Sequence, residues 1–436
     1  MAFYPFPMKN AQARFAQLDP GHFHSALVLR DSLPGVDPVI HVYSPLNSLL
    51  AAHLNLIGEF NSRKANPTEW KLEIHAGPES LERMLRELPG NVVVLAGFNG
   101  SKIHKILACL EKGLHVFADK PWVIDPADFF LLEKALALAK EKNLVALDIM
   151  TERHEAVSLY QRALVSCPEL CGKPINDGQP AMVLKSSHAL LKMVNGLPLR
   201  RPASFFNIRD NGEGLADVGI HLADLALWVL FPNQPIDWKT EVQVDRARRW
   251  EVDLSLEEFT AITSLKEFPD SLAEWVAGGR LKFLGNNLVD FRVRGIPIHL
   301  QTAWEFHQGF GADSYSSLVR GENGDVEILQ DASTGNRPEL FLKPKSSLGR
   351  NPEQRLGEIL RSLGLQGCVE ARGEKFNLQV PQELRTGHES HFGKVTRQFL
   401  SYFSGEEKAP SWEYPVQLAR YFITMEGVKK GRAAQV

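Results

Sequence analysis

Asp217 and His221 stand four residues apart in a run that begins with the glycine-rich turn Gly212-Glu213-Gly214 and continues with apolar residues. At 3.6 residues per turn, the two side chains share one face of the predicted helix. An imidazole beside a carboxylate is a candidate general base with its orienting partner. Two other interpretations remain open. Asp217 could simply favour a helix N-terminus, and His221 could be a buried core histidine.

Lys120 is the second residue with the type and setting to do chemistry. It lies in Asp119-Lys120-Pro121, directly after an apolar run at 115–118 that reads as a buried strand. An ammonium group at such a strand end can stabilise negative charge that develops on a substrate oxygen. A solvated surface lysine is the alternative interpretation.

The elements around Lys120 predict a parallel sheet. Up to about residue 150, strands rich in β-branched and apolar residues alternate with helical segments, which is typical of βαβ units. The expected strands are 13–18, 39–43, 72–75, 92–96, 115–118 and 144–149, with helices at 25–32, 80–88, 102–112 and 127–141. Ligands of such sheets bind beyond the carboxyl ends of the strands, where Lys120 is expected.

From about residue 240 the pattern changes to short strands separated by turn signals such as Arg294-Gly295 and Asn323-Gly324. This pattern predicts a mostly antiparallel sheet, with strands at 281–284, 288–293, 296–303, 316–320 and 326–329. We expect a long loop at 167–201, a surface insertion at 345–375 and closing helices within 388–430. The fold class is therefore α/β: a Rossmann-type domain over 1–150 and a C-terminal α/β domain with a large open sheet over 151–436.

Composition excludes several classes of partner. Lys plus Arg number 49 against 52 Asp plus Glu, a net charge of −3, so neither nucleic acid nor an anionic membrane is an expected partner. No uncharged apolar run approaches the roughly 18 residues of a membrane span. The four cysteines are few and irregular, which favours free thiols in a reducing compartment, and residues 1–10 lack the features of an export signal. We therefore expect a cytoplasmic protein.

The run 92–121 and the run 212–224 together resemble the Gfo/Idh/MocA family of nicotinamide-dependent oxidoreductases, which includes glucose-fructose oxidoreductase and inositol dehydrogenase. In that family an E-K-P turn and a D-x-G-x-H-x-x-D helix supply the catalytic groups. The resemblance implies NAD or NADP as cofactor and hydride transfer to or from a secondary alcohol of a sugar, cyclitol or related polyol. It implies that His221 is the base, that Asp217 orients it and that Lys120 polarises the oxygen.

The resemblance also implies where the cofactor binds. Aligned on the last residue of the family's G-x-G-x-x-G-x-x-H motif, His24 and Gly21 match, while Ala16 and Leu18 replace the first two glycines. Ser44 stands where an acidic residue normally bonds the ribose, and Asn99 resembles the family's asparagine near the nicotinamide ribose. The expected cofactor-binding residues are Gly21, His22, Phe23, His24, Ser44, Asn99, Asp119, Lys120 and Pro121.

The pair His22-x-His24 also has the spacing of a metal motif found in amidohydrolase barrels, but eight βα units are not readable, so no metal is expected. Arg153, Arg209 and Asp210 are candidate substrate residues, with a structural salt bridge as the alternative for Arg153. We expect a small carbohydrate-like substrate and a homodimer or homotetramer. Two other functions remain open, because some relatives are NAD-dependent glycosidases and others are non-catalytic sugar sensors.

Overall fold

The computed structural model describes residues 12–194 and 196–434, so the interpretation of residues 1–10 lies outside the described residues. The chain divides into two compact units. The first comprises Met1–His154 and Gly387–Tyr414, and the second comprises Glu155–Thr386 and Pro415–Val436. The sequence-based division placed 388–430 wholly in the second domain, whereas the chain returns to the first unit for 387–414.

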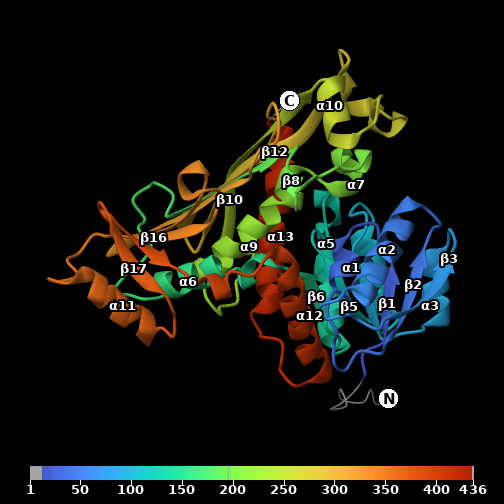
Figure 1. Ribbon diagram of the computed structural model, residues 1–436, viewed down its shortest axis with the longest axis horizontal. Coiled ribbons are helices and arrows are strands. Elements are labelled where there is room, and N and C mark those ends of the chain that lie inside the picture. The colour runs from blue at the N-terminus through green and yellow to red at the C-terminus, as the bar shows by residue number, and fades with distance from the viewer. Residues whose placement is uncertain (1–11, 195, 435–436) are drawn as a thin grey trace. The chain divides into compact units, whose positions relative to one another are not determined.

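The first unit is built on a six-stranded parallel sheet (Figure 1). In spatial order its strands are β3 (Lys71–Ala76), β2 (Val39–Ser44), β1 (Phe15–Leu18), β4 (Val92–Leu95), β5 (His115–Asp119) and β6 (Ala146–Ile149). All five pairings are parallel. This order is that of the doubly wound Rossmann fold, in which the strand sequence reverses between β1 and β4. The predicted fold class of the first part of the chain is confirmed.

The helices of this unit differ from the prediction near the N-terminus. The helices are α1 (His24–Leu27), α2 (Ser48–Ser62), α3 (Ser80–Glu87), α4 (Lys102–Glu111) and α5 (Phe129–Glu141). The helix expected at 25–32 is only the single turn α1, and α2 was not predicted. Asn47 caps α2 by accepting a hydrogen bond from the Leu50 N–H, and its buried face carries Leu50, His53 and Ile57.

Helix α12 (His388–Ser404) belongs to the first unit because its apolar face completes that core. Phe392, Phe399 and Phe403 are buried in one cluster with residues of β1, β2 and β4. The Phe399 ring stacks on Phe117 of β5, with 4.7 Å between centroids. The aromatic spacing along α12 indicates a buried face, but the sequence alone does not say which sheet it covers.

The second unit contains a ten-stranded mixed sheet. Its strands are β7 (Met182–Ala189), β10 (Val242–Leu254), β11 (Val276–Ala277), β12 (Arg280–Val293), β13 (Ile296–Glu305), β14 (Ser314–Arg320), β15 (Gly324–Gln330), β16 (Glu339–Pro344), β17 (Cys368–Arg372) and β18 (Lys375–Gln379). Every pairing is antiparallel except that of β7 with β13. The predicted large, mostly antiparallel sheet is confirmed.

Two predictions about loops in this unit were wrong. The expected loop 167–201 contains β7, which lies inside the sheet between β13 and β14. Its side chains alternate, with Met182, Leu184 and Ser186 buried, which is the period-2 pattern of a strand. The expected irregular insertion 345–375 contains α11 (Pro352–Ser362), all of β17 and the first residue of β18. Here Leu356, Ile359 and Leu360 form a buried face at helical spacing.

The remaining helices of the second unit are α6 (Ala156–Val165), α7 (Ile208–Asn211), α8 (Gly214–Asp217), α9 (Gly219–Leu230), α10 (Leu256–Thr263) and most of α13 (Glu413–Ala433). Helix α9 packs on β7 and β13, and α6 packs on β15 and β16. Among the described residues, no helix combines the length and apolarity needed to cross a membrane.

Candidate functional site

The predicted cofactor residues lie at one edge of the first sheet. Gly21, His22, Phe23 and His24 follow β1, Ser44 ends β2, Asn99 follows β4, and Asp119 ends β5 ahead of Lys120 and Pro121. Because parallel strands end at the same edge, the sheet brings these separate segments to its carboxyl side. This edge includes the point between β1 and β4 where the strand order reverses.

The first two glycine positions of the family motif, which hold Ala16 and Leu18 here, lie in strand β1 rather than in the turn. Ala16 and Leu18 are buried side chains of this strand, with 2 % and 1 % of their surfaces exposed. The turn itself begins at Asp19, which has a positive φ of 45°. It packs against the turn after β4, since a Cβ added to Gly97 would lie 2.3 Å from the Asp19 carbonyl oxygen. The side chains of Ala16 and Leu18 are therefore buried in the sheet and do not project from its carboxyl edge.

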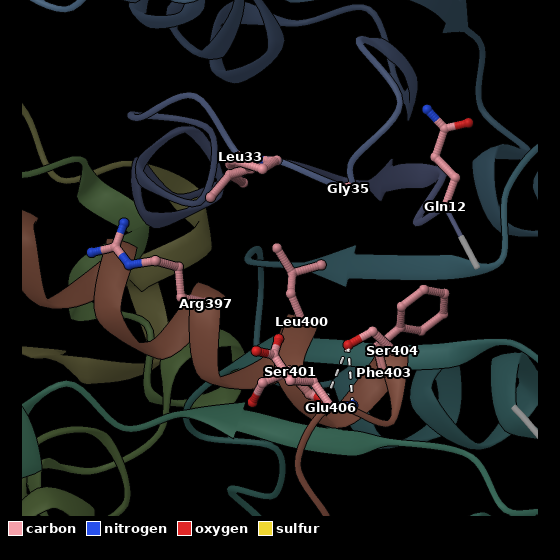
Figure 2. A pocket seen from close by; sticks show the side chains of 10 residues that line it. Gln12, Leu33, Gly35, Arg397, Leu400, Ser401, Phe403, Ser404 and Glu406 are labelled. Carbon is pink, nitrogen blue, oxygen red and sulfur yellow. Dashed lines mark hydrogen bonds between the residues drawn. The ribbon is translucent and has the colours of Figure 1, made fainter. Parts of the chain in front are cut away.

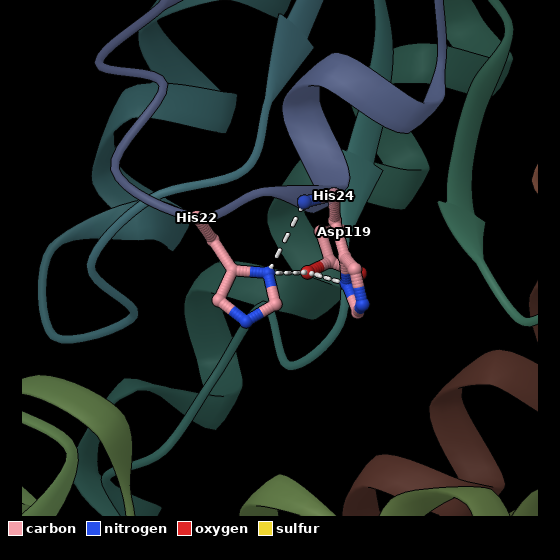
Figure 3. A group of neighbouring side chains, drawn as sticks. All are labelled: His22, His24 and Asp119. Atoms are coloured by element: carbon pink, nitrogen blue, oxygen red, sulfur yellow. Dashed lines mark hydrogen bonds and ion pairs between the residues drawn. The ribbon is translucent and has the colours of Figure 1, made fainter. Parts of the chain in front are cut away.

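His24 and Asp119 form a closely packed polar pair at this edge (Figure 3). The Nδ1 atom of His24 lies 2.8 Å from Asp119 Oδ2, and His22 Nδ1 lies 3.9 Å from the same oxygen. Burial opposes the charge on Asp119, but the neighbouring His24 and Lys102 hold the pKa of this carboxyl below its usual range. Asp119 is therefore a carboxylate at neutral pH.

Lys102 is a functional candidate that was not among the predicted site residues. It is the first residue of α4, yet it is only 2 % exposed. Its Nζ donates to Asn99 Oδ1 at 2.6 Å and to the Asp119 carbonyl oxygen at 2.9 Å. A cation at a helix N-terminus opposes the helix dipole, and that conflict was the available sequence signal. Lys102 ties the turn after β4 to the end of β5.

Arg153 makes a salt bridge within the first unit. Its Nη1 donates to both carboxylate oxygens of Glu413 at 3.1 Å, and its guanidinium lies 5.5 Å from the Trp412 ring centroid. These contacts agree with the structural alternative given for Arg153.

The first unit also has a pocket at the opposite edge of its sheet (Figure 2). It is lined by Gln12, Leu33, Pro34, Gly35, Arg397, Leu400, Ser401, Phe403, Ser404 and Glu406. Residues 12 and 33–35 precede β1 and β2, so the pocket lies at the amino ends of these strands. It is therefore separate from the candidate cofactor edge.

In the second unit, Asp217 and His221 lie on two helical segments instead of one. Asp217 is the last residue of α8, and α9 begins at Gly219. The His221 N–H donates to the Val218 carbonyl oxygen at 3.2 Å, one residue closer than in a regular α-helix. Both side chains are partly exposed, unlike most of α9, so His221 is not a fully buried core histidine.

The glycine-rich turn ahead of Asp217 is packed against β12. A Cβ added to Gly214 would lie 1.8 Å from the Gly285 carbonyl oxygen, so only glycine fits here. Glu213 is 1 % exposed and accepts hydrogen bonds from Arg249 and Arg432, each at 2.9 Å. Packing against β12 thus requires the glycine at position 214, and buried salt bridges hold Glu213 in place.

Arg201 is another residue that the sequence did not single out. Its guanidinium stacks on Phe205 and Trp304, at 4.7 and 4.6 Å from the ring centroids. Burial lowers the pKa of Arg201 to about 10, while the charges of Asp313 and Asp217 act to raise it. Arg201 thus places a positive charge within electrostatic range of Asp217. No sequence pattern links these residues, because they are spread over more than a hundred positions.

Asp313 accepts a hydrogen bond from Lys192 Nζ and lies 3.7 Å from His188 Nδ1. Burial opposes its charge, but His188 and Lys192 hold the pKa of Asp313 below its usual range. Arg209 is exposed and pairs with Glu274, while Asp210 accepts from Asn207 Nδ2 at 2.8 Å. Burial raises the pKa of Asp210.

Comparison with known families identifies the larger part of the chain. Residues 160–432 match the family model described as "Putative oxidoreductase C terminal domain". The chain belongs to this oxidoreductase family. A crystal structure of a "putative oxidoreductase" from Parabacteroides merdae is 35 % identical, with a TM-score of 0.93, and the match covers 97 % of this chain and 98 % of that one. The predicted enzyme class, an oxidoreductase, is confirmed by this family.

More distant members of the fold extend the likeness. A "putative myo-inositol dehydrogenase" from Sinorhizobium meliloti is 11 % identical, with a TM-score of 0.55 and coverage of 97 % and 98 %. A 3-ketoreductase from Actinomadura kijaniata, solved with NADP, is 12 % identical, with a TM-score of 0.55 and coverage of 96 % and 97 %. At these identities the likeness shows the fold alone. No curated protein matched the chain.

Proposed function

We propose that the protein is an NAD- or NADP-dependent oxidoreductase that moves a hydride between nicotinamide and a secondary alcohol or ketone of a carbohydrate-like substrate. The observation that carries the proposal is the doubly wound sheet of the first unit, with polar side chains gathered at its carboxyl edge. Dinucleotides bind such sheets where the strand order reverses. The family matched by residues 160–432 supports the same reaction class.

The residues at this edge fit a dinucleotide. The turn after β1 carries Gly21, which packs close to the turn after β4, since a Cβ added to Gly21 would lie 3.4 Å from the Gly97 Cα. Ser44 is a neutral residue at the end of β2, which is compatible with either a ribose hydroxyl or a 2′-phosphate. Gly21, His22, Phe23, His24, Ser44, Asn99, Asp119, Lys120 and Pro121 would hold the cofactor. When bound, the nicotinamide ring accepts or donates the hydride.

The chain supplies the groups that move the proton and stabilise charge. His221 removes the hydroxyl proton at a ring nitrogen as the alcohol is oxidised, and Asp217 favours the resulting imidazolium. Lys120 stabilises negative charge on the substrate oxygen. Partial exposure of Asp217 and His221 supports these roles, because a base must reach its substrate. Arg209 and Asp210 are proposed to assist substrate binding, while Arg153 is proposed to have the structural role that its salt bridge with Glu413 supports.

Relatives of the same fold support the choice of cofactor and substrate class. The Actinomadura 3-ketoreductase was solved with NADP, and a protein of gentamicin A biosynthesis was solved with NAD. We further propose a cytoplasmic homodimer or homotetramer, which light scattering of the purified protein can test.

The experiment that tests the function compares His221→Asn with wild type in the presence of a polyol and keto-sugar panel and all four nicotinamide forms. The variant should lower turnover by roughly 10²- to 10⁴-fold, the usual worth of a positioned base. His307→Asn, at an exposed histidine of the same unit, is the matched control and should leave turnover unchanged. A net absorbance change at the reduced-nicotinamide band identifies a dehydrogenase.

Two outcomes of this experiment contradict the proposal. Release of an aglycone without a net absorbance change would identify a glycosidase. Sugar binding without turnover of any kind would identify a sensor.

A further inference from the structure

We propose that His22, His24 and Asp119 bind a divalent transition-metal ion. These three side chains come from the turn after β1 and from the end of β5, 95 residues away for His24 and Asp119. One ligand atom of each lies within 4.8 Å of the others. Two imidazoles and one carboxylate form a donor set that suits Zn²⁺, Fe²⁺ and Co²⁺. The proposal departs from the sequence-based expectation that the protein binds no metal.

The spacing of the donors is close to that of a metal site. Ligands held at 2.0–2.1 Å by a tetrahedral ion lie about 3.3 Å apart. The two histidine Nδ1 atoms lie 2.8 and 3.9 Å from Asp119 Oδ2, on either side of that value. Figure 3 shows both rings presenting Nδ1 toward the carboxylate. Small side-chain rotations would therefore bring all three donors to an ion.

The second oxygen of Asp119 gives an independent argument. Asp119 is 4 % exposed, and its Oδ1 is buried without a hydrogen-bond partner. A buried, unsatisfied carboxylate oxygen costs free energy unless something else supplies positive charge to it. A metal ion held by this carboxylate would satisfy the oxygen, either directly or through a bound water.

The surrounding charges leave the carboxylate available to the two histidines. Lys102 bonds the Asp119 backbone oxygen and Asn99.

The site is also accessible. The side chain of His22 is 46 % exposed, which offers an entry path for an ion. His388, the first residue of α12, lies beside the site, with its ring centroid 5.3 Å from that of His24. Three protein ligands would leave a coordination position for water or for an oxygen of a small molecule.

The test is calorimetric titration of the untagged, chelator-treated protein with Zn²⁺ and Mg²⁺, together with Co²⁺ absorption spectra. We expect one Zn²⁺ per chain, no Mg²⁺ binding because the nitrogen donors suit softer ions, and tetrahedral Co²⁺ bands in the visible range. His24→Asn and Asp119→Asn should each weaken Zn²⁺ binding by at least about 100-fold. His22→Asn changes a half-exposed residue, so it should fold and should also weaken binding.

The control is His41→Asn, which disrupts a separate histidine group formed by His41, Glu73 and His75. In that group the Arg83 guanidinium lies 3.1 Å from His75 Nδ1. Because this positive charge already contacts one of the possible ligands, a metal ion is not expected to bind there. The control should bind Zn²⁺ like wild type. Absence of stoichiometric Zn²⁺ binding, or binding that survives in all three site variants, would overturn the proposal. No dinucleotide is present in this experiment, so its failure would leave the proposed oxidoreductase activity standing.

Discussion

Asp224 accepts a hydrogen bond from Arg420 Nη1 at 2.8 Å inside the second unit, where 1 % and 0 % of the two side chains are exposed. The pair joins α9 to α13, which are almost two hundred residues apart along the chain. Asp224 is the last residue of the D-x-G-x-H-x-x-D run. Its partner shows that this end of the motif anchors a helix, while Asp217 and His221 remain the candidates for chemistry.

The buried pair predicts a large stability effect. Arg420→Met leaves the Asp224 carboxylate buried without its guanidinium, and breaking such a pair typically costs about 3–5 kcal/mol. Arg355→Met, which breaks an exposed pair with Glu169, should cost under about 1 kcal/mol. Urea unfolding followed by circular dichroism measures both. Equal losses in the two variants would show that the buried pair has no special role.

The glycine of the same motif gives a second stability prediction. Gly214→Ala should destabilise the protein by several kcal/mol, roughly at the upper end for single substitutions, since its Cβ would overlap the Gly285 carbonyl oxygen. Gly58→Ala is the control, because Gly58 lies within α2 and a Cβ there meets nothing within 4 Å. This change should stabilise by about 0.5–1 kcal/mol. Thermal unfolding distinguishes the two, and a tolerated Gly214→Ala would contradict the packing argument.

His53 predicts a pH dependence of stability. It is 2 % exposed, its Nε2 lies 2.7 Å from Gln17 Oε1, and burial lowers its pKa from 6.5 to about 4. The folded state therefore keeps His53 neutral while the unfolded state takes up a proton. Neutral His53 therefore contributes to the free energy of unfolding fully above pH 6.5. This contribution, about 3 kcal/mol, is lost as the pH falls toward 4.

The corresponding measurement is urea unfolding of wild type and His53→Gln between pH 7.5 and 4. The variant should lose less stability than wild type over this range, because it has no group at this position to protonate. Parallel pH profiles for the two proteins would show that the His53 pKa is not lowered.

Lys120 should be needed for turnover but not for folding. Lys120→Met keeps the apolar stem and removes the charge, so the protein should still fold, which circular dichroism and urea unfolding check. Turnover should fall by orders of magnitude, because the substrate oxygen would lose its stabilising cation. Lys112→Met, at an exposed lysine after α4, should behave like wild type in both assays. Wild-type turnover in Lys120→Met would refute the assignment.

Much of the first sheet could be predicted from the sequence because its strands are unbroken apolar runs. Val92, Val93 and Val94 are buried on both faces, as expected for the centre of a parallel sheet. Strand β7 escaped prediction because Lys185, Ser186, Ser187 and His188 make it look like a loop, although alternate residues face the core. Local composition could not reveal that it lies between two other strands.

The candidate site was predictable only where motifs are local. Asp119 with Lys120, and Asp217 with His221, are each close in sequence and were found by pattern. The contacts of His24 with Asp119, and of Arg201 with its aromatic partners, depend on strand order and on loops distant in sequence. Such relationships need the folded chain, because no periodicity joins their members.

The most direct test of the oxidoreductase account is calorimetric titration of the purified protein with NAD⁺, NADH, NADP⁺ and NADPH in separate experiments. The account predicts that at least one form binds with one molecule per chain. It also predicts that a substitution at the carboxyl edge of the first sheet, Asn99→Ala, weakens that binding, while Ser401→Ala in the pocket at the opposite edge does not. No binding of any of the four forms at millimolar concentration would contradict the account.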